Sequence, residues 1–422
     1  MNLEGIIAFI FVFGIIVFVH ELGHFIFAKL FKVIVFEFSI GMGPEIFGLN
    51  KGGTNYSVRL LPVGGYVLLA GPFKDNEYLR ELRPGKMISY HLDNFKKIDV
   101  ISFNTNNFKE NFGLLRIKKI FFKDTLEIEG SFSDNSKSNV TFALNPHAKL
   151  RVSDNKELII PSKFRQLQNI SYWKQALINL AGPLMNLILA LFLFLAISFG
   201  ISSVPINSNQ INITPNYPAA QAGLQNGDHI KNINSNTVKN WSDISRNISN
   251  LKEKKIKIGY VRNNDKEKFI YTHLKPKKIN GEKKYLLGIQ EKTSSKVKNK
   301  IIFSFSNFTN NFFLIWSAIF KLIRHPNLNQ LGGPVEIARI SNTAAKSGFI
   351  SIFQLIAFLS LNIGIFNLIP IPVFDGGKIL LNFLSLIRGK PLSNEINEFI
   401  LILSVIFIFL LMIAVTVNDL MR

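Results

Sequence analysis

The sequence predicts a polytopic α-helical membrane protein with four transmembrane helices, a membrane-associated β-hairpin, a β-rich insert and a small α+β domain. Two observations lead to this fold class. Of the 422 residues 47% are hydrophobic and only 18% are charged, and the mean hydropathy is +0.22. Four runs are long and apolar enough to cross a hydrocarbon core, which takes about 20 helical residues. These runs are residues 6–30, 176–204, 349–371 and 399–417.

A fifth apolar run, residues 312–323, is too short to span and follows a stretch rich in Ser and Asn. We expect it to lie at the membrane interface or to pack against the other helices. The first run is expected to remain in the protein, because no basic residue precedes it and no small-residue cleavage site follows it. The chain has no cysteine, which excludes disulfides and thiolate metal ligands.

The formal net charge of +21 raises the question of a nucleic-acid partner. Lys and Arg are spread along the chain, without an arginine-rich groove motif or the signature of a nucleic-acid-binding fold. We therefore expect no nucleic acid among the partners. We expect part of the excess of Lys and Arg to lie next to the membrane and to attract the anionic headgroups of the lipid bilayer.

Basic residues beside the spans predict the orientation of the protein. Lys29 and Lys32 close the first span, which no Lys or Arg precedes, and Lys378, Arg388 and Lys390 lie between the third and fourth spans. Short flanks rich in Lys and Arg face the cytoplasm. The N-terminus, the polar region between the second and third spans and the C-terminus are then expected outside.

Three ionisable residues lie inside the first apolar run, in the sequence His20-Glu21-Leu22-Gly23-His24. Residues four apart share one face of a helix, so both imidazoles can bind one metal ion with Glu21 beside the open position. In a soluble helix the same pattern often arises by chance. Within a membrane span, unpaired imidazoles and a carboxylate would be costly, so the metal site is the favoured interpretation.

A catalytic zinc site needs a third protein ligand, and Asp375 is the candidate. It follows Asn367 and two prolines, Pro370 and Pro372, which cannot both lie in an intact helix. The third span should therefore unwind beside the carboxylate. The first and third spans run in the same direction, so His20 and Asp375 can share one membrane depth. The alternative is that Asp375 only caps the following helical segment.

β-structure is expected after the first span. Residues 33–39 alternate weakly, residues 41–44 should turn the chain, and strands at 55–61 and 66–70 should flank a break at 62–65, which together make a short hairpin. Residues 74–162 contain short strand-like stretches separated by Asn, Asp, Ser and Gly. They predict a β-rich insert whose role the sequence does not reveal.

The polar region between the second and third spans contains the run PAAQAGLQNGD at residues 218–228, followed by a helical stretch at 241–248 and strands at 256–261 and 269–272. This pattern resembles a PDZ domain, including its carboxylate-loop and turn signature, although a plain loop is the alternative. PDZ domains bind an extended peptide as an added strand.

The predicted division of the chain follows from these features. The first span with the hairpin takes residues 1–73, the cytoplasmic insert 74–165, the second span 166–204, the PDZ-like domain 205–290, an amphipathic linker 291–345, and the third and fourth spans 346–422.

Taken together, the motifs resemble the site-2 protease family of intramembrane zinc metalloproteases, in the bacterial regulator-of-sigma-E protease branch. The resemblance rests on His20 to His24, residues 54–67, residues 181–186, the PDZ-like segment, residues 332–335 and residues 367–377, which occur in family order. It covers most of the chain outside the insert.

The resemblance implies a multi-pass protein of the bacterial inner (cytoplasmic) membrane, with its active site near the cytoplasmic side. His20, His24 and Asp375 would be the zinc ligands, Glu21 the catalytic acid/base, and Asn367 a substrate-binding residue. The implied substrates are single-span membrane proteins, such as anti-sigma factors or signal-peptide remnants, cut in regulated intramembrane proteolysis.

A helical substrate hides its carbonyls in hydrogen bonds and must unwind before hydrolysis. We expect Gly64 and Gly65 of the hairpin to accept the unwound stretch as an added strand. The chain departs from the family in having one legible PDZ-like domain rather than two, and a longer insert.

Two other functions compete with proteolysis. A non-catalytic PDZ scaffold with structural zinc is disfavoured because such sites usually fill all four positions with protein ligands. A metal transporter is disfavoured because the fourth span, residues 399–417, has no ionisable residue.

Overall fold

The computed structural model describes residues 3–71, 77–104, 112–122, 126–132, 139–153, 156–249, 255–263, 265–279, 282–327, 332–390 and 392–421. The chain divides into two compact units. The first comprises Met1–Leu193 and Asn310–Arg422, and the second comprises Phe194–Thr309.

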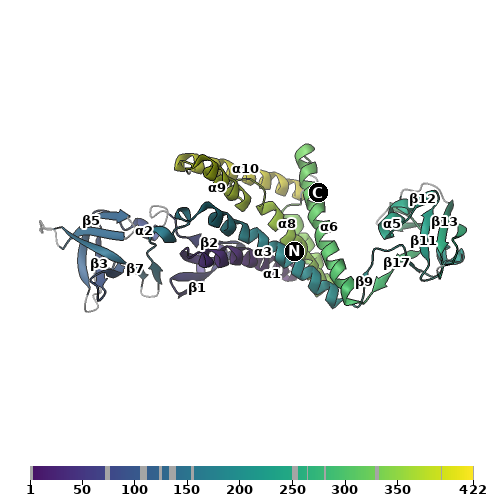
Figure 1. Cartoon of the computed structure of the whole chain (residues 1–422), viewed down its shortest axis with the longest axis horizontal. Coiled ribbons are helices and arrows are strands. Elements are labelled where there is room, and N and C mark those ends of the chain that lie inside the picture. Colours follow the sequence, from purple (N-terminus) through teal and green to yellow (C-terminus); the bar gives the residue numbers. More distant parts are fainter. Residues whose placement is uncertain are drawn as a thin grey trace. The chain divides into compact units, whose positions relative to one another are not determined.

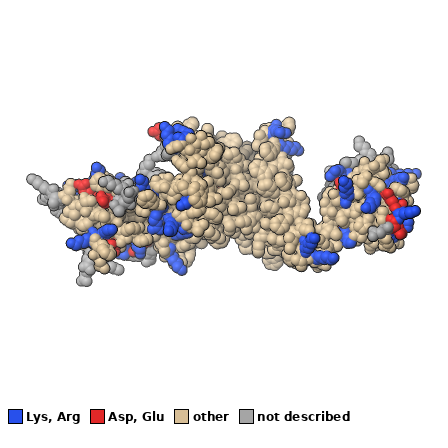
Figure 2. Space-filling view, in the orientation of Figure 1, with Lys and Arg blue, Asp and Glu red and all other residues tan. Residues whose placement is uncertain are grey.

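Among the described residues four helices are long and apolar enough to cross a membrane, which confirms the predicted number of spans. They are α1 (Leu3–Leu30), α3 (Tyr172–Gly200), α8 (Phe349–Asn367) and α10 (Asn394–Met421) (Figure 1). α1 packs against α8 and against α7 (Pro334–Ser347), which also contacts α8 and α10. Lys and Arg are sparse over the middle of the helices of the first unit (Figure 2), as expected of a surface that faces lipid.

The third span ends where the sequence predicts that the helix breaks. α8 stops at Asn367, and α9 (Asp375–Arg388) begins after a seven-residue connection, residues 368–374. This connection curls back over the start of α9. A Cβ atom on Gly376 would lie 2.3 Å from the carbonyl oxygen of Leu368, and one on Gly377 would lie 2.1 Å from that of Ile371. The two glycines therefore allow the backbone approach that places Asp375.

The predicted linker, residues 291–345, forms helices. The apolar run at 312–323 belongs to α6 (Val297–Arg324), a continuous helix of 28 residues. Thr309 in its polar middle donates a hydrogen bond back to the carbonyl of Phe305 at 2.9 Å, so the helix itself satisfies this hydroxyl. The start of α7 is capped by Asp419 of α10, which accepts hydrogen bonds from the N–H groups of Gly333 (2.8 Å) and Glu336 (3.3 Å).

The β-structure after α1 is a longer β-ribbon than the predicted hairpin, with a further reversal at its tip. β1 (Val35–Lys51) and β2 (Thr54–Leu69) are continuous strands, and the chain reverses at Gly52 and Gly53. The chain also reverses at the predicted turn, residues 41–44, and at the predicted break, residues 62–65, because residues 37–40 run parallel to residues 55–58 but antiparallel to residues 65–68, and residues 47–49 run antiparallel to residues 56–58. Gly41 and Gly43 have positive φ angles of 88° and 85°, and the register shifts there mark bulges through which the strand reverses.

Because both strands reverse direction, the β1–β2 ribbon folds back on itself and forms a sheet of more than two neighbouring segments. Residues 37–40 pair with residues 55–58 and also with residues 65–68. The segment that contains Gly65 therefore lies at an edge, with residues 35–40 as its strand neighbour. Strand edges of this kind carry free backbone groups that can pair with another chain.

The insert forms a six-stranded sheet in the order β4-β3-β5-β6-β7-β8, and β4 also pairs with β7. Its strands are β3 (Met87–Leu92), β4 (Ile98–Ser102), β5 (Gly113–Phe122), β6 (Leu126–Ser131), β7 (Val140–Ser153) and β8 (Lys156–Ile159). The β4–β7 pairing closes five strands on themselves around a buried aliphatic core that includes Ile88, Ile101, Leu115 and Leu150. Short helical turns flank the sheet: α2 (Glu77–Arg80), η2 (Lys163–Arg165) and η3 (Leu167–Asn169).

The second unit is an α+β domain. Its main sheet has the order β12-β11-β13-β14, and three antiparallel pairs accompany it, β10 with β17, β15 with β16 and β9 with β18. The elements are β9 (Val204–Pro205), β10 (Ile211–Ile213), α4 (Pro218–Gln221), β11 (His229–Ile233), β12 (Asn236–Thr237), α5 (Trp241–Ser249), β13 (Lys255–Val261), β14 (Lys268–His273), β15 (Lys275–Ile279), β16 (Glu282–Leu286), β17 (Ile289–Glu291) and β18 (Thr293–Ser294).

A groove of about 630 Å³ lies in this domain between α5 and residues 285–290. The run at 218–228, whose signature was assigned to the carboxylate loop, does not line it. That run forms α4 and a turn, and its Asp228 carboxylate is buried against Arg262 at 2.8 Å. The turn thus stabilises the domain core, while the groove belongs to a later segment.

Candidate metal centre

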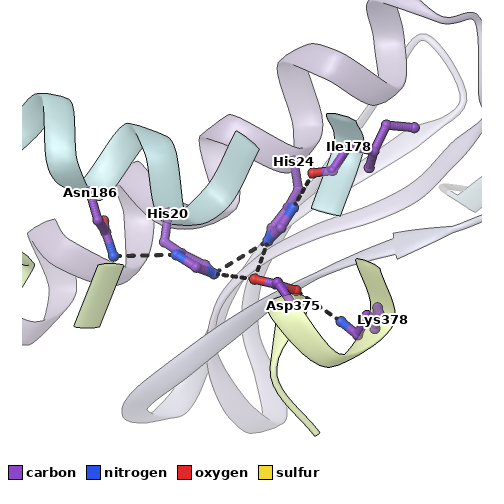
Figure 3. A network of polar contacts seen from close by, with 6 residues as sticks. All are labelled: His20, His24, Ile178, Asn186, Asp375 and Lys378. Carbon is purple, nitrogen blue, oxygen red and sulfur yellow. Dashed lines mark hydrogen bonds and ion pairs between the residues drawn. The ribbon is translucent and has the colours of Figure 1, made fainter. Parts of the chain in front are cut away.

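His20, His24 and Asp375 form the one group of three possible metal ligands among the described residues. The histidines lie one turn apart on α1, and Asp375 is the first residue of α9 (Figure 3). Asp375 Oδ2 lies 3.1 Å from His20 Nε2 and 3.2 Å from His24 Nε2, and the two Nε2 atoms are 3.3 Å apart. The structure therefore brings together three residues that are up to 355 positions apart in sequence.

These distances suit zinc. Zinc–nitrogen and zinc–oxygen bonds of about 2.0–2.1 Å in a tetrahedral site imply ligand atoms about 3.3 Å from one another. The three observed separations of 3.1–3.3 Å match one face of such a tetrahedron. The fourth corner has no protein ligand in this group, which is the pattern of catalytic rather than structural zinc sites.

Hydrogen bonds to α3 orient both rings. His24 Nδ1 lies 2.7 Å from the carbonyl oxygen of Ile178, so it carries the proton and leaves Nε2 free for metal. His20 Nδ1 lies 3.2 Å from the side-chain amide of Asn186, whose Oδ1 is buried without a hydrogen-bond partner among the described atoms. Exchanging the amide nitrogen and oxygen lets His20 Nδ1–H donate to Oδ1. This arrangement again leaves Nε2 for metal.

Two glycines bring α3 against the histidines. A Cβ atom on Gly182 would lie 2.3 Å from His24 Nε2 and 2.9 Å from His20 Cε1. On α1, a Cβ atom on Gly23 would lie 2.4 Å from the carbonyl oxygen of Ala181. Our interpretation of the sequence gave no role to Gly182 or Asn186, although both belong to the segment 181–186 that carried part of the family resemblance.

Glu21 lies beside the edge of the β-sheet. A Cβ atom on Gly65 would be 3.3 Å from Glu21 Cγ, 2.7 Å from the Ser39 carbonyl oxygen and 2.7 Å from a methyl group of Val17. Any other residue at 65 would push the strand away from α1. The absence of a side chain at Gly65 thus places the sheet edge next to the carboxylate.

Gly64 and Asn367 are the other two residues predicted to bind substrate. Gly64 has a φ of +81° and packs on Met42, so it shapes the bend before the edge segment. Asn367 is the half-buried last residue of α8. No described hydrogen bond joins its side chain to the three ligand candidates, so its predicted role remains a prediction.

A second carboxylate, Glu37, stabilises the sheet beside Glu21. Its Oε1 accepts hydrogen bonds from Ser57 at 2.6 Å and from Arg59 at 2.6 Å. Burial alone raises the pKa of Glu37, but the bonds from Ser57 and Arg59 outweigh it and hold the pKa below its ordinary value. Burial and the nearby Glu37 charge raise the pKa of Tyr66 to about 12. Glu37 is therefore ionised at neutral pH, and its charged hydrogen bonds stabilise the strands of this sheet.

A largely buried His–His–Asp centre between apolar helices, with a glutamate beside the histidines, is the arrangement of a membrane zinc metalloprotease. The chain belongs to peptidase family M50, the site-2 protease family, whose model matches residues 8–411. It is 38% identical over 421 residues to "Putative zinc metalloprotease" of Streptococcus pneumoniae serotype 4, covering 99% of each chain.

Two further relatives are similarly close. The chain is 36% identical to "Probable protease eep" of Enterococcus faecalis over 427 residues, covering 100% of this chain and 99% of the relative. It is also 36% identical to "Putative zinc metalloprotease LL2128" of Lactococcus lactis over 434 residues, with the same coverage. These matches confirm the family, the metalloprotease activity and the use of zinc that the sequence motifs predict.

Proposed function

We propose that this protein hydrolyses peptide bonds of single-span membrane proteins within the bilayer, with His20, His24 and Asp375 as zinc ligands. One observation carries the proposal: the three ligand atoms lie 3.1–3.3 Å apart between apolar helices. When bound, zinc polarises the substrate carbonyl and makes water nucleophilic near neutral pH.

Glu21 is the proposed general base and acid. It occupies the position after His20, so its carboxylate reaches the same side of α1 as the open coordination corner. It accepts a proton from the attacking water and returns it to the leaving amine. Lys378 Nζ lies 3.1 Å from Asp375 Oδ1 and forms an ion pair with it. The other carboxylate oxygen, Oδ2, faces the histidines.

The edge segment around Gly65 is the proposed substrate platform. An unwound substrate stretch can pair with it as an added strand, which supplies the backbone hydrogen bonds lost on unwinding. Gly64 shapes the bend before this edge, and Gly65 brings the edge beside Glu21. We further propose that the Asn367 amide orients the substrate backbone.

The groove of the second unit is the proposed site for a regulatory peptide. It is lined by apolar side chains of α5 and of the facing strands, including Ile244, Ile248, Leu287 and Ile289. Such a groove between a helix and a strand suits an extended peptide, as in PDZ domains. Peptide binding in this groove would control which substrates reach the metal centre. Anti-sigma factors and signal-peptide remnants are the proposed substrate classes.

The proposed setting is the bacterial inner membrane. The basic flanks of the first, third and fourth spans support an orientation with the metal centre toward the cytoplasmic side and the α+β domain outside. Regulated intramembrane proteolysis follows from this arrangement, because outer and inner segments of a substrate would meet different domains.

A Glu21→Gln variant tests the function. The amide cannot accept the proton, so cleavage of a single-span substrate should fall to background while zinc remains bound. The non-catalytic scaffold predicts equal behaviour of wild type and variant. Near-normal turnover by the variant would refute the assigned role of Glu21.

A further inference from the structure

A second cavity, of about 530 Å³, lies in the first unit where α1 ends and α3 begins. Its walls come from the end of α1, the turn at Gly52 and Gly53, the insert and the segment before α3. Volumes in this range are typical of small-molecule sites. None of the residues that line this cavity belongs to the metal centre.

The cavity is strongly basic. Lys29, Lys32, Arg165 and Lys174 line it together with His147, and none of the described lining residues is Asp or Glu. In Figure 2, Lys and Arg gather at the end of the helices next to the insert. Four cations around one cavity repel one another, so an anion bound among them would be stabilised.

The cations have neutral partners in the described structure. Lys29 Nζ donates to Thr54 Oγ1 at 2.8 Å, and Arg165 Nε donates to the Lys32 carbonyl at 3.5 Å. Lys174 Nζ lies 5.8 Å from the ring centre of Phe31 and 5.5 Å from that of Trp173. These contacts position the charges without neutralising them.

The cavity lies at the level expected for lipid headgroups. α1 and α3 are candidate spans, and the segment that follows α1 is joined to the segment that precedes α3 by a hydrogen bond from Ile34 N–H to the Arg165 carbonyl at 3.1 Å. Phe164 and Trp173 are 63% and 57% exposed beside it. Exposed aromatic rings at the end of a span are typical of the membrane interface. A soluble anion would gain nothing from these rings.

We propose that this cavity binds the phosphodiester headgroup of an anionic membrane lipid. Lys32, Arg165 and Lys174 would surround the phosphate, and the start of α3 would add the partial positive charge of a helix N-terminus. The acyl chains would continue along the apolar surfaces of α1 and α3. One bound lipid would thus contact the first two spans, the hairpin turn and the insert.

The test measures lipid binding, which needs no proteolysis. Phosphatidylglycerol is titrated onto the detergent-solubilised full chain in excess phosphatidylcholine, and bound lipid is counted by native mass spectrometry. The double variant Arg165→Gln, Lys174→Gln should bind phosphatidylglycerol about 25-fold more weakly, about fivefold for each lost charge. Arg388→Gln, Lys390→Gln is the matched control, because it removes the same charge outside the cavity and should bind like wild type.

Four results would overturn the proposal. Equal losses in the two double variants would mean general attraction to anionic lipid, and wild-type binding by the first variant would exclude the cavity. Displacement of the lipid by millimolar inorganic phosphate would identify a soluble anion as the ligand. A separate measurement needs only the wild-type protein. Phosphatidylglycerol should raise its melting temperature more than phosphatidylcholine does, and equal melting temperatures would contradict the proposal.

Discussion

Substituting Gly182 by Ala should weaken zinc binding at the metal centre without changing any ligand. The new Cβ atom would lie 2.3 Å from His24 Nε2. Ordinary contact between such atoms requires about 3.5 Å, so the ring must move by about 1.2 Å. Metal sites tolerate deviations of about 0.2 Å in ligand distance. Zinc affinity should therefore fall about 100-fold, and cleavage should fall by at least about 100-fold.

Zinc affinity is measured by competition with a chromogenic chelator, and cleavage is measured with a single-span substrate in the same detergent. Gly14→Ala is the control, because it makes the same substitution on α1 at a position with no atom within 4 Å of the added Cβ. Its zinc affinity should equal that of wild type. If Gly182→Ala keeps wild-type zinc affinity and turnover, the close packing of α3 on the histidines does not position the ligands.

Three further predictions concern the sheet, the second unit and the topology. Glu37→Gln should cost about 2 kcal/mol of stability at neutral pH through the loss of charged hydrogen bonds. Because folding lowers the pKa of Glu37, the stability difference between wild type and variant should reach its full size above the ordinary glutamate pKa and should shrink as the pH falls below about 4. Thermal melts at pH 7 and at lower pH measure this difference, and an equal difference at both would contradict the prediction. Deleting residues 207–278 should leave zinc bound and raise cleavage of untrimmed substrate, whereas loss of cleavage of a trimmed substrate by the folded variant would make the domain a required recruiter. In intact cells an impermeant thiol reagent should label Ser235→Cys but not Asn94→Cys, and the opposite pattern would invert the proposed orientation.

Local patterns in the sequence were sufficient for the spans and for the ligand candidates. Apolar length alone identifies the four helices, and a four-residue spacing places His20 and His24 on one face. The prolines after Asn367 predicted the break that positions Asp375. Each of these features depends on neighbouring residues and on the cost of polar groups in lipid, so no knowledge of tertiary packing was needed.

Features that depend on tertiary packing were missed. Gly41 and Gly43 predicted the turn between them, but not the pairing of residues 37–40 with both residues 55–58 and residues 65–68, which depends on how the ribbon folds back on itself. The contacts of Gly182 and Asn186 with the histidines exist only because α3 lies against α1. The groove of the second unit is lined by residues 285–290, which the sequence pattern did not distinguish from an ordinary strand.

Zinc K-edge X-ray absorption on the purified protein tests the central claim most directly. The account predicts one zinc per chain, with two imidazoles and a carboxylate oxygen among ligands at about 2.0–2.2 Å. In the His20→Ala, His24→Ala double variant, zinc should be lost or its imidazole scattering should disappear. Undiminished zinc with an unchanged spectrum in that variant would show that the metal is bound elsewhere and would contradict the assignment.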